Sequence, residues 1–283
     1  LPEGDGMQET PAEDKTPAEL QADWQMEALY KIGAARFAQQ NYQAAIDAWQ
    51  QYANRFPNGS HWASSQKRVI HAEFLQGVEA LAAQAYTTAR ENFERFLQRH
   101  PLDDRARQIL FVFGQMHVAE AQQMEEEEAP KNNVADTYRA AIDEWAKLIS
   151  KYPNTEESSL ALYRTGVIYE EKLGQLEKAL ETYRRLTWGS YAPQARQRLS
   201  VMTRKALTLN TERKFRTNET ARVRLNTRNI EQVTVKLYRF NLEAYYRKRH
   251  ALADVHALDV ALIEPDRTWT VKLDGYEKYK PVE

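Results

Sequence analysis

Residues 42–58 read YQAAIDAWQQYANRFPN, with small and aromatic residues at spacings typical of a helix. Ala45 and Trp49 lie four residues apart, so they share one face of a helix, and Pro57 follows eight residues later. Proline has no backbone N–H to continue a helix, so the stretch is expected to be one helix with a defined end. Gly33 lies 12 residues before Ala45 in another run with helical apolar spacing. The stretch therefore predicts the second helix of a helical hairpin.

The same positions recur in three further copies along the chain. The four copies are Gly33, Ala45, Trp49 and Pro57; Gly77, Ala89, Phe93 and Pro101; Gly114, Ala141, Trp145 and Pro153; and Gly166, Ala179 and Tyr183. The third copy has 15 extra residues between glycine and alanine, and the fourth has Tyr191 where the others have proline. Residues 24–205 are therefore expected to form a repeat array.

Small residues at two of the four positions predict close contact between helices. We expect the glycine of the first helix and the alanine of the second to let two antiparallel helices approach each other. The aromatic residue is expected to fill the space between repeats. One hairpin cannot bury its apolar face alone, so successive hairpins must stack.

With these positions, residues 42–58 resemble the tetratricopeptide repeat, especially the version in bacterial outer-membrane assembly and Tol-associated periplasmic proteins. The resemblance implies a right-handed α–α superhelix over residues 21–205, with a groove that receives a protein or peptide partner. Two features depart from the family pattern. Leu29, Glu73, Leu110 and Leu162 replace the aromatic residue usual near the start of the repeat, and the alanines lie 44, 52 and 38 residues apart instead of about 34.

An aromatic residue also lies three positions before each repeat glycine, at Tyr30, Phe74, Phe111 and Tyr163. In a tetratricopeptide array this position tends to face the groove, so the four side chains would form a ladder that contacts a partner. Aromatic rings suit this role because they bury a large area with few rotatable bonds. The alternative is that they pack neighbouring first helices together, and both interpretations stay open.

The composition argues against several classes of function. The 283 residues include 39 basic and 40 acidic residues, so no excess of positive charge supports nucleic-acid binding. No apolar run reaches the roughly 18 residues of a membrane-spanning helix. The absence of cysteine removes thiol catalysis, disulfides and cysteine-ligated metals. The histidines and glycines match no metal, triad or phosphate-binding spacing, so we expect no enzyme, metal or cofactor. The acidic run 125–128 could bind a cation or a basic partner, but it is expected to be a solvated helix end because adjacent like charges prefer water.

The two ends of the chain differ from the repeats. Residues 1–20 are rich in proline, glycine and charge, which predicts a disordered tether. From about residue 206 apolar and polar residues alternate, which predicts a small antiparallel β-sandwich over 206–283, joined to the repeats by a helix at 193–205. Within it we expect two strands in 221–240 with a turn at 226–229, a short helix in 241–255, and two strands in 258–273. Trp269 is expected to be buried.

Residues 211–248 and 266–281 resemble an early macroglobulin-like domain of bacterial alpha-2-macroglobulin-like proteins. The resemblance implies that the chain is a non-catalytic, truncated N-terminal piece of a large exported peptidase-trapping protein, periplasmic or extracellular, with peptidases as partners of the whole. One alternative is an envelope-assembly scaffold unrelated to peptidase inhibition, with the sheet as a docking module. Another is a carbohydrate-binding module in which Trp188, Tyr245, Tyr246 and Trp269 stack on sugars.

Overall fold

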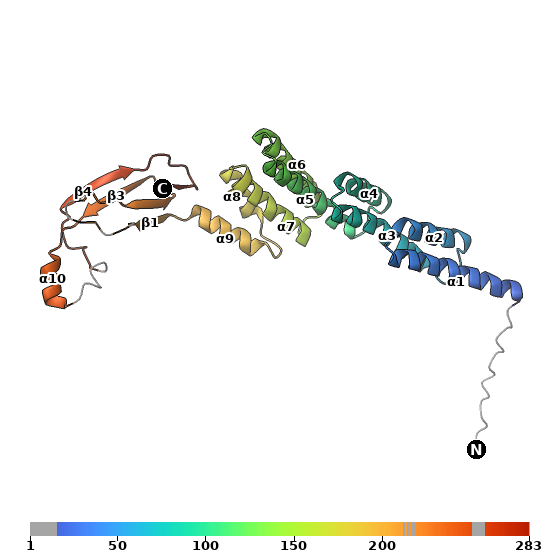
Figure 1. Cartoon of the computed structure of the whole chain (residues 1–283). Helices are drawn as coiled ribbons and strands as arrows, with labels where there is room; N and C mark the ends of the chain where they lie inside the picture. The colour runs from blue at the N-terminus through green and yellow to red at the C-terminus, as the bar shows by residue number, and fades with distance from the viewer. Residues whose placement is uncertain (1–15, 212, 214, 217–218, 251–257, 283) are drawn as a thin grey trace, which may run out of the picture. The chain divides into compact units, whose positions relative to one another are not determined.

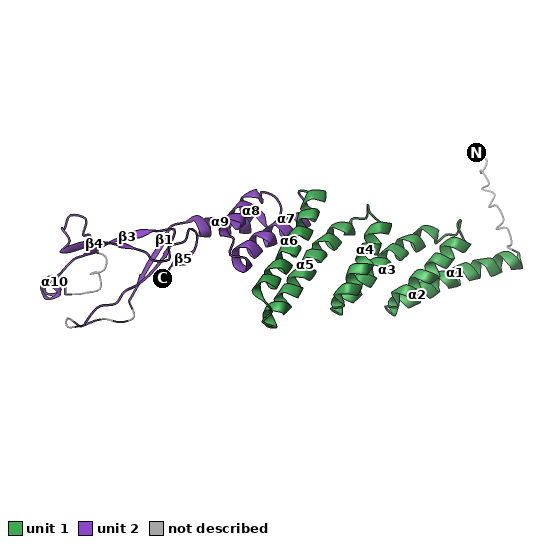
Figure 2. Cartoon of the chain, turned by 90° about the horizontal axis from the view of Figure 1, so that it is seen from above, with its two compact units in different colours: residues 1–153 green, residues 154–283 purple. Residues whose placement is uncertain are grey.

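The computed structural model describes residues 16–211, 213, 215–216, 219–250 and 258–282. The chain divides into two compact units, Leu1–Pro153 and Asn154–Glu283, which are coloured separately in Figure 2. Each unit is described by itself.

Unit 1 consists of helical hairpins in sequence order (Figure 1). They are α1 (Pro17–Ala38) with α2 (Tyr42–Arg55), α3 (Trp62–Ala82) with α4 (Tyr86–Arg99), and α5 (Arg105–Glu126) with α6 (Lys131–Lys151). Contacts also join α2 to α3 and α4 to α5, so each hairpin packs on the next. This stacking buries the apolar faces that one hairpin would leave in water.

The extra residues of the third copy lengthen both helices of its hairpin. Helix α5 continues for twelve residues past Gly114, to Glu126, whereas α3 ends five residues after Gly77. Helix α6 begins ten residues before Ala141, whereas α2 begins three residues before Ala45. Each helix therefore gains seven residues, about two turns. Equal growth keeps the two antiparallel helices paired along their length.

Helix α1 begins inside the predicted tether. The Thr16 side chain accepts a hydrogen bond from the Glu19 backbone N–H at 3.3 Å, and the Glu19 carboxylate accepts one from the Thr16 N–H at 2.7 Å. Pro17 occupies the first helical position, where no N–H is required. Residues 17–20 are therefore helical because this capping box starts the helix, and the rest of the predicted tether, 1–15, lies outside the described residues.

Unit 2 begins with the fourth helical hairpin. Helix α7 (Glu156–Val167) continues through a π-helical turn, η1 (Ile168–Lys172), and pairs with α8 (Leu176–Arg185). Helix α9 (Ala192–Thr203) packs against both α7 and α8. Helix α9 ends at Thr203 and the first strand begins at Ala206, where the sequence changes from helical spacing to alternation. The assignment of 206–283 as a separate domain stays a prediction.

The strands of unit 2 form two small antiparallel sheets. One has the order β1 (Ala206–Asn210), β2 (Arg224–Arg228), β5 (Pro281–Val282), and the other pairs β3 (Gln232–Leu237) with β4 (Arg267–Lys272). Helix α10 (Leu242–Arg249) lies in the predicted helical stretch. The fold class is therefore α+β, with tetratricopeptide-like hairpins followed by small antiparallel sheets.

Three details of the β prediction are wrong. The strands in 221–240 do not pair with each other, because β2 pairs with β1 and β5 while β3 pairs with β4. The segment 258–264 forms turns instead of a strand. Trp269 is 44% exposed, since it lies opposite Val235 in a sheet of two strands whose residues are mostly exposed.

Asn229 links the end of α9 to the first sheet. Its Nδ2 donates hydrogen bonds to the carbonyl oxygens of Met202 at 2.7 Å and Arg204 at 3.0 Å, and its Oδ1 accepts one from the Tyr279 N–H at 2.8 Å. Its φ of 57° is in the left-handed region, which asparagine tolerates better than most residues. The turn predicted at 226–229 is therefore wrong for 226–228, which belong to β2, and Asn229 after the strand caps the end of α9.

Candidate partner-binding surface of the helical repeats

Each repeat glycine lies directly beneath the aromatic ring of its own repeat. A Cβ atom added to Gly33 would overlap the Trp49 ring, and one added to Gly77 would overlap the Phe93 ring. In the same way, Gly114 lies against Trp145 and Gly166 against Tyr183. The aromatic residue therefore fills the space inside each hairpin first, although Phe93 also contacts Phe113 of the next one.

The tryptophan repeats add a hydrogen bond to this contact. Trp49 Nε1 donates to the Tyr30 carbonyl oxygen at 3.2 Å, and Trp145 Nε1 donates to the Phe111 carbonyl oxygen at 3.0 Å. Both acceptors lie three residues before the repeat glycine, in the helical turn that the ring covers. The indole thus fixes the second helix to one turn of the first.

The other repeat positions also occupy equivalent places. The repeat alanines Ala45, Ala89, Ala141 and Ala179 are all 0% exposed. The repeat prolines Pro57, Pro101 and Pro153 are exposed and lie one residue after the helix C-caps. In the fourth copy α8 ends at Arg185 without such a proline.

In the first two repeats the groove candidates make similar clusters. The Tyr30 ring stacks on His61 at a centroid distance of 4.1 Å and meets Tyr52 edge-on at 6.1 Å. The Phe74 ring meets Phe96 at 5.8 Å, and the Arg105 guanidinium lies 5.3 Å from its centroid. His61 and Arg105 both belong to the start of the following repeat. Each candidate ring is therefore in contact with its own hairpin and with the next.

The other two candidates also pack within the chain. The Phe111 ring stacks on Trp145 at 5.7 Å and is only 9% exposed. The Tyr163 ring contacts Tyr183 at 6.1 Å and stacks on Tyr191 at 5.6 Å. Tyr30, Phe74 and Tyr163 are half-buried, so part of each ring stays accessible. Their role as partner contacts stays a prediction.

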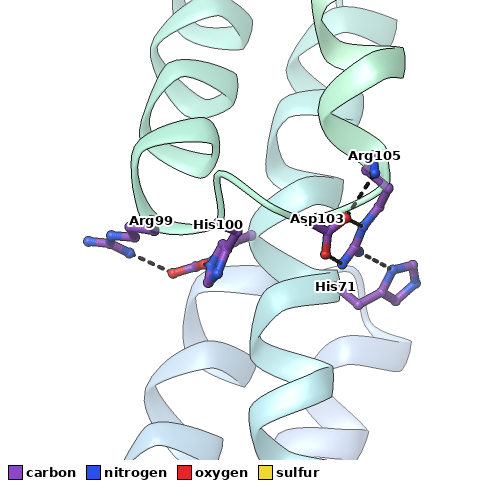
Figure 3. A network of polar contacts seen from close by, with 6 residues as sticks. His71, Arg99, His100, Asp103 and Arg105 are labelled. Carbon is purple, nitrogen blue, oxygen red and sulfur yellow. Dashed lines mark hydrogen bonds and ion pairs between the residues drawn. The ribbon is translucent and has the colours of Figure 1, made fainter. Parts of the chain in front are cut away.

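A buried carboxylate that the sequence did not point out lies between α3 and α4. The Glu73 side chain is 8% exposed, and its oxygens lie 2.5 Å from Arg99 Nη1 and 2.6 Å from His100 Nε2. Figure 3 shows Arg99 and His100 together on one side of the network. Glu73 occupies a position where the repeat family has an aromatic residue, and this departure was the available signal. The ion pair with Arg99 and the hydrogen-bond contact with His100 compensate for burying the carboxylate.

A second carboxylate at this site holds the start of α5. Asp103 accepts hydrogen bonds from the Arg105 backbone N–H at 2.9 Å and from its Nε and Nη2 at 2.7 Å (Figure 3). These bonds lower the pKa of Asp103 below its ordinary value. Arg105 Nη1 lies 3.4 Å from His71 Nδ1. Burial, with the nearby Arg105 charge, lowers the pKa of His71.

A polar hollow of about 310 Å³ opens beside this network in unit 1. Its lining combines side-chain amides with guanidinium groups and comes from α2, α3 and α4: Gln43, Gln76, Asn92, Arg95 and Arg99, with Glu73 and Phe96. Gln76 Nε2 donates to Gln43 Oε1 at 3.0 Å across two hairpins. Such groups can exchange internal hydrogen bonds for bonds to a peptide.

A smaller hollow of about 290 Å³ lies in unit 2 beside Tyr163 and Arg198. Arg198 Nη1 donates to Glu170 at 3.0 Å and to Glu171 at 2.6 Å. Burial opposes the Arg198 charge, but these hydrogen bonds raise the pKa of its guanidinium. Burial, and then the hydrogen bond to Glu170 at 2.8 Å, raises the pKa of Tyr183. The guanidinium therefore stays charged and the phenol neutral.

The remaining candidates do not assemble into a site. Residues 125–128 are exposed, and α5 ends within them at Glu126. No group of three or more metal-ligating side chains is found in the part of the chain that the structure describes. The proposed sugar-stacking residues lie on separate elements: Trp188 donates to Ser158, Tyr245 and Tyr246 are in α10, and Trp269 is in β4.

Comparison with known proteins covers the helical repeats. The family model described as "YfiO: Outer membrane lipoprotein" matches residues 22–204. Curated relatives named outer membrane protein assembly factor BamD, from Neisseria gonorrhoeae and Neisseria meningitidis serogroup A, are each 27% identical over 171 residues. The match covers 59% of this chain, and the chain spans 60% of the length of these relatives.

These comparisons give no support to the macroglobulin-like identification of the β region. The family model ends at residue 204, before the first strand. They also lend no support to peptidases as partners. Among the described residues, no helix has both the length and the apolar character needed to cross a membrane.

Proposed function

The chain belongs to the YfiO family of outer membrane lipoproteins, and on that premise we propose that it is a non-catalytic scaffold for assembling outer membrane proteins. The proposal rests on the match of this family across residues 22–204, which contain all four glycine–aromatic pairs. The name of the curated relatives, outer membrane protein assembly factor, gives the process. We place the protein at the outer membrane of a bacterial envelope.

The repeats are suited to a scaffold because the contacts that hold each hairpin together lie inside it, which leaves surface side chains available to a partner. Rigid contacts lie at the glycine–aromatic pairs inside each hairpin. The polar hollow between α2, α3 and α4 is lined by none of the residues of those pairs. We propose protein segments as its occupants, with the exposed parts of Tyr30 and Phe74 as further contacts in unit 1. The exposed part of Tyr163 is proposed as a separate contact in unit 2.

The sheets of unit 2 are proposed as a docking module. Strands β3 and β4 present apolar side chains that include Leu237, 48% exposed, and Trp269, 44% exposed. Exposed apolar side chains on paired strands favour contact with another protein. This assignment keeps the envelope-scaffold role and requires no peptidase.

Depletion in the host tests the proposal. The amounts of integral outer-membrane proteins and inner-membrane proteins are measured by quantitative mass spectrometry as the protein is depleted. We expect the outer-membrane set to fall while the inner-membrane set stays constant, with restoration by the wild-type chain. Unchanged outer-membrane proteins after full depletion would contradict an assembly role.

A second pair of variants separates partner contact from packing. Phe74→Ala and Phe111→Ala are compared for melting temperature and for the ability to restore the outer-membrane proteins. If the aromatic side chains contact a partner, we expect the variants to fail to restore the outer-membrane proteins at temperatures where they remain folded. If both variants lose function only where they unfold, the four rings serve packing alone.

A further inference from the structure

The outer face of α1 carries an apolar stripe with no partner among the described residues. Trp24 is 76% exposed and Ile32 is 48% exposed, and Ala28 between them is also exposed. Residues four apart lie on the same side of a helix, so these three form one stripe. Within unit 1, Figure 2 shows α1 at the end of the stack, with the other hairpins on one side of it.

The repeat register shows that this stripe belongs to a stacking face. Ala28 lies five residues before its repeat glycine, as do Ala72 in α3 and Ile109 in α5. Ala72 and Ile109 are 0% exposed, because they pack against α2 and α4 of the preceding hairpins. Ile32 corresponds in the same way to Phe113, which is 4% exposed. The positions of Ala28 and Ile32 are thus both buried in α5, whereas Trp24 corresponds to Arg68 and Arg105, which are not buried.

We propose that this face binds the same face of a second copy of the chain, with the two α1 helices antiparallel. A two-fold interface uses one patch twice, so the patch must complement itself. A two-fold axis at Ala28 places Trp24 of each copy beside Ile32 of the other, and the two small Ala28 side chains let the helices approach closely. This arrangement places Ala28 of the two copies close to each other at the two-fold axis.

The charges of α1 favour the antiparallel arrangement. Asp23 and Glu27 lie before Ala28, while Lys31 and Arg36 follow it. An antiparallel pair places the acidic half of each helix beside the basic half of the other. Lys31 already reaches Glu27 of its own helix, with Nζ 3.2 Å from Oε1, and both side chains are partly exposed.

A hollow beside the stripe adds surface to the interface. It measures about 740 Å³ and is lined by Trp24 with neighbouring residues of α1, by Arg55 at the end of α2, and by the loop 56–61 between α2 and α3. A single helix face is at the small end of specific interfaces, so the hollow is where a partner side chain adds contact area. We expect dissociation constants on the order of 10 μM, within reach of solution measurements.

Sedimentation velocity of the whole chain over about 1–200 μM tests the proposal. The wild type is expected to shift from monomer to dimer with concentration. Trp24→Glu is expected to weaken association by at least about tenfold, and the matched control Leu102→Glu, at a 96% exposed loop position, is expected to leave it unchanged. A wild type that stays monomeric, or a Trp24→Glu chain that dimerises like the control, would overturn the proposal.

Cross-linking tests the geometry separately from the affinity. The chain has no cysteine, so Ala28→Cys introduces a single thiol near the two-fold axis. Mild oxidation is expected to give a covalent dimer in high yield, and adding Trp24→Glu is expected to reduce that yield to the level of a Leu102→Cys control. Equal yields from Ala28→Cys and Leu102→Cys would refute this interface.

Discussion

The indole ring of Trp145 covers Gly114, and its Nε1 donates a hydrogen bond at 3.0 Å to the carbonyl oxygen of Phe111 in the same turn of α5. Trp49 makes the same pair of contacts with Gly33 and Tyr30 in the first repeat, with a hydrogen bond of 3.2 Å. In these two hairpins the ring and the hydrogen bond together set the register of the two helices.

Replacing Trp145 separates the two contributions. Trp145→Phe keeps a ring over Gly114 and loses the hydrogen bond, so we expect a cost of about 1–2 kcal/mol in the free energy of unfolding. Trp145→Ala also loses the ring and leaves a cavity, for about 3–5 kcal/mol. Chemical denaturation measures both values. Equal costs for the two variants would show that the hydrogen bond dominates and the ring contact contributes nothing.

His71 makes stability depend on pH above the range of the carboxylates. Its pKa is lowered from 6.5 in the folded state, so the unfolded chain binds more protons and the free energy of unfolding falls as the pH drops below about 6.5. We expect His71→Asn to lose less stability than the wild type between pH 7.5 and 5.5. His250→Asn, at the left-handed C-cap of α10 where asparagine is tolerated, is the control for the histidine-to-asparagine substitution itself.

Asp103 acts in a lower window. Its pKa is lowered from 3.8 by Arg105, so the stability it contributes is present above that value and is lost as the pH falls below it.

The His71 prediction has its own contradicting outcome. If the free energy of unfolding of the wild type and of His71→Asn changed with identical slopes between pH 7.5 and 5.5, His71 would make no contribution.

Asn229 is expected to hold α9 to the first sheet. Asn229→Ala removes the bonds to the Met202 and Arg204 carbonyls and strains the backbone at φ 57°, whereas Asn229→Gly removes the bonds and relieves the strain. We expect costs of about 2–4 kcal/mol and about 1–2 kcal/mol respectively. Hydrogen exchange of residues 200–210 is the measurement. Unchanged protection of these amides from hydrogen exchange in Asn229→Ala would show that the Asn229 hydrogen bonds are not needed to hold α9 to the sheet.

The sequence predicted the helical repeats well because their contacts follow from fixed spacing. Gly77 and Phe93 are 16 residues apart, and the hairpin brings one over the other without help from distant residues. The pattern did not reveal that each ring first covers its own glycine. Glu73 was also missed as a buried group, because its burial depends on Arg99 and His100, which lie 26 and 27 residues away.

The β region was harder to predict because strand pairing is set by distant partners. Alternation located β2 and β3, but it could not show that they pair with β1 and β4 instead of each other. Trp269 shows the same limit: its alternation with polar residues predicted burial, whereas its sheet has two strands and leaves it 44% exposed. The pattern locates a strand, and tertiary partners decide which of its faces is covered.

A double-mutant cycle on Gly77 and Phe93 measures whether the aromatic ring and the glycine of one repeat are coupled in the folded chain. Gly77→Ala favours helix formation by itself, yet its Cβ would overlap the Phe93 ring, so we expect a net loss of about 1–3 kcal/mol. Phe93→Leu shortens the side chain, and in that background Gly77→Ala is expected to cost at least about 1 kcal/mol less. Thr88→Ala, at an exposed position of α4, is the control and is expected to be neutral. Additive effects of the two substitutions, or a stabilising Gly77→Ala in the wild-type background, would contradict the account.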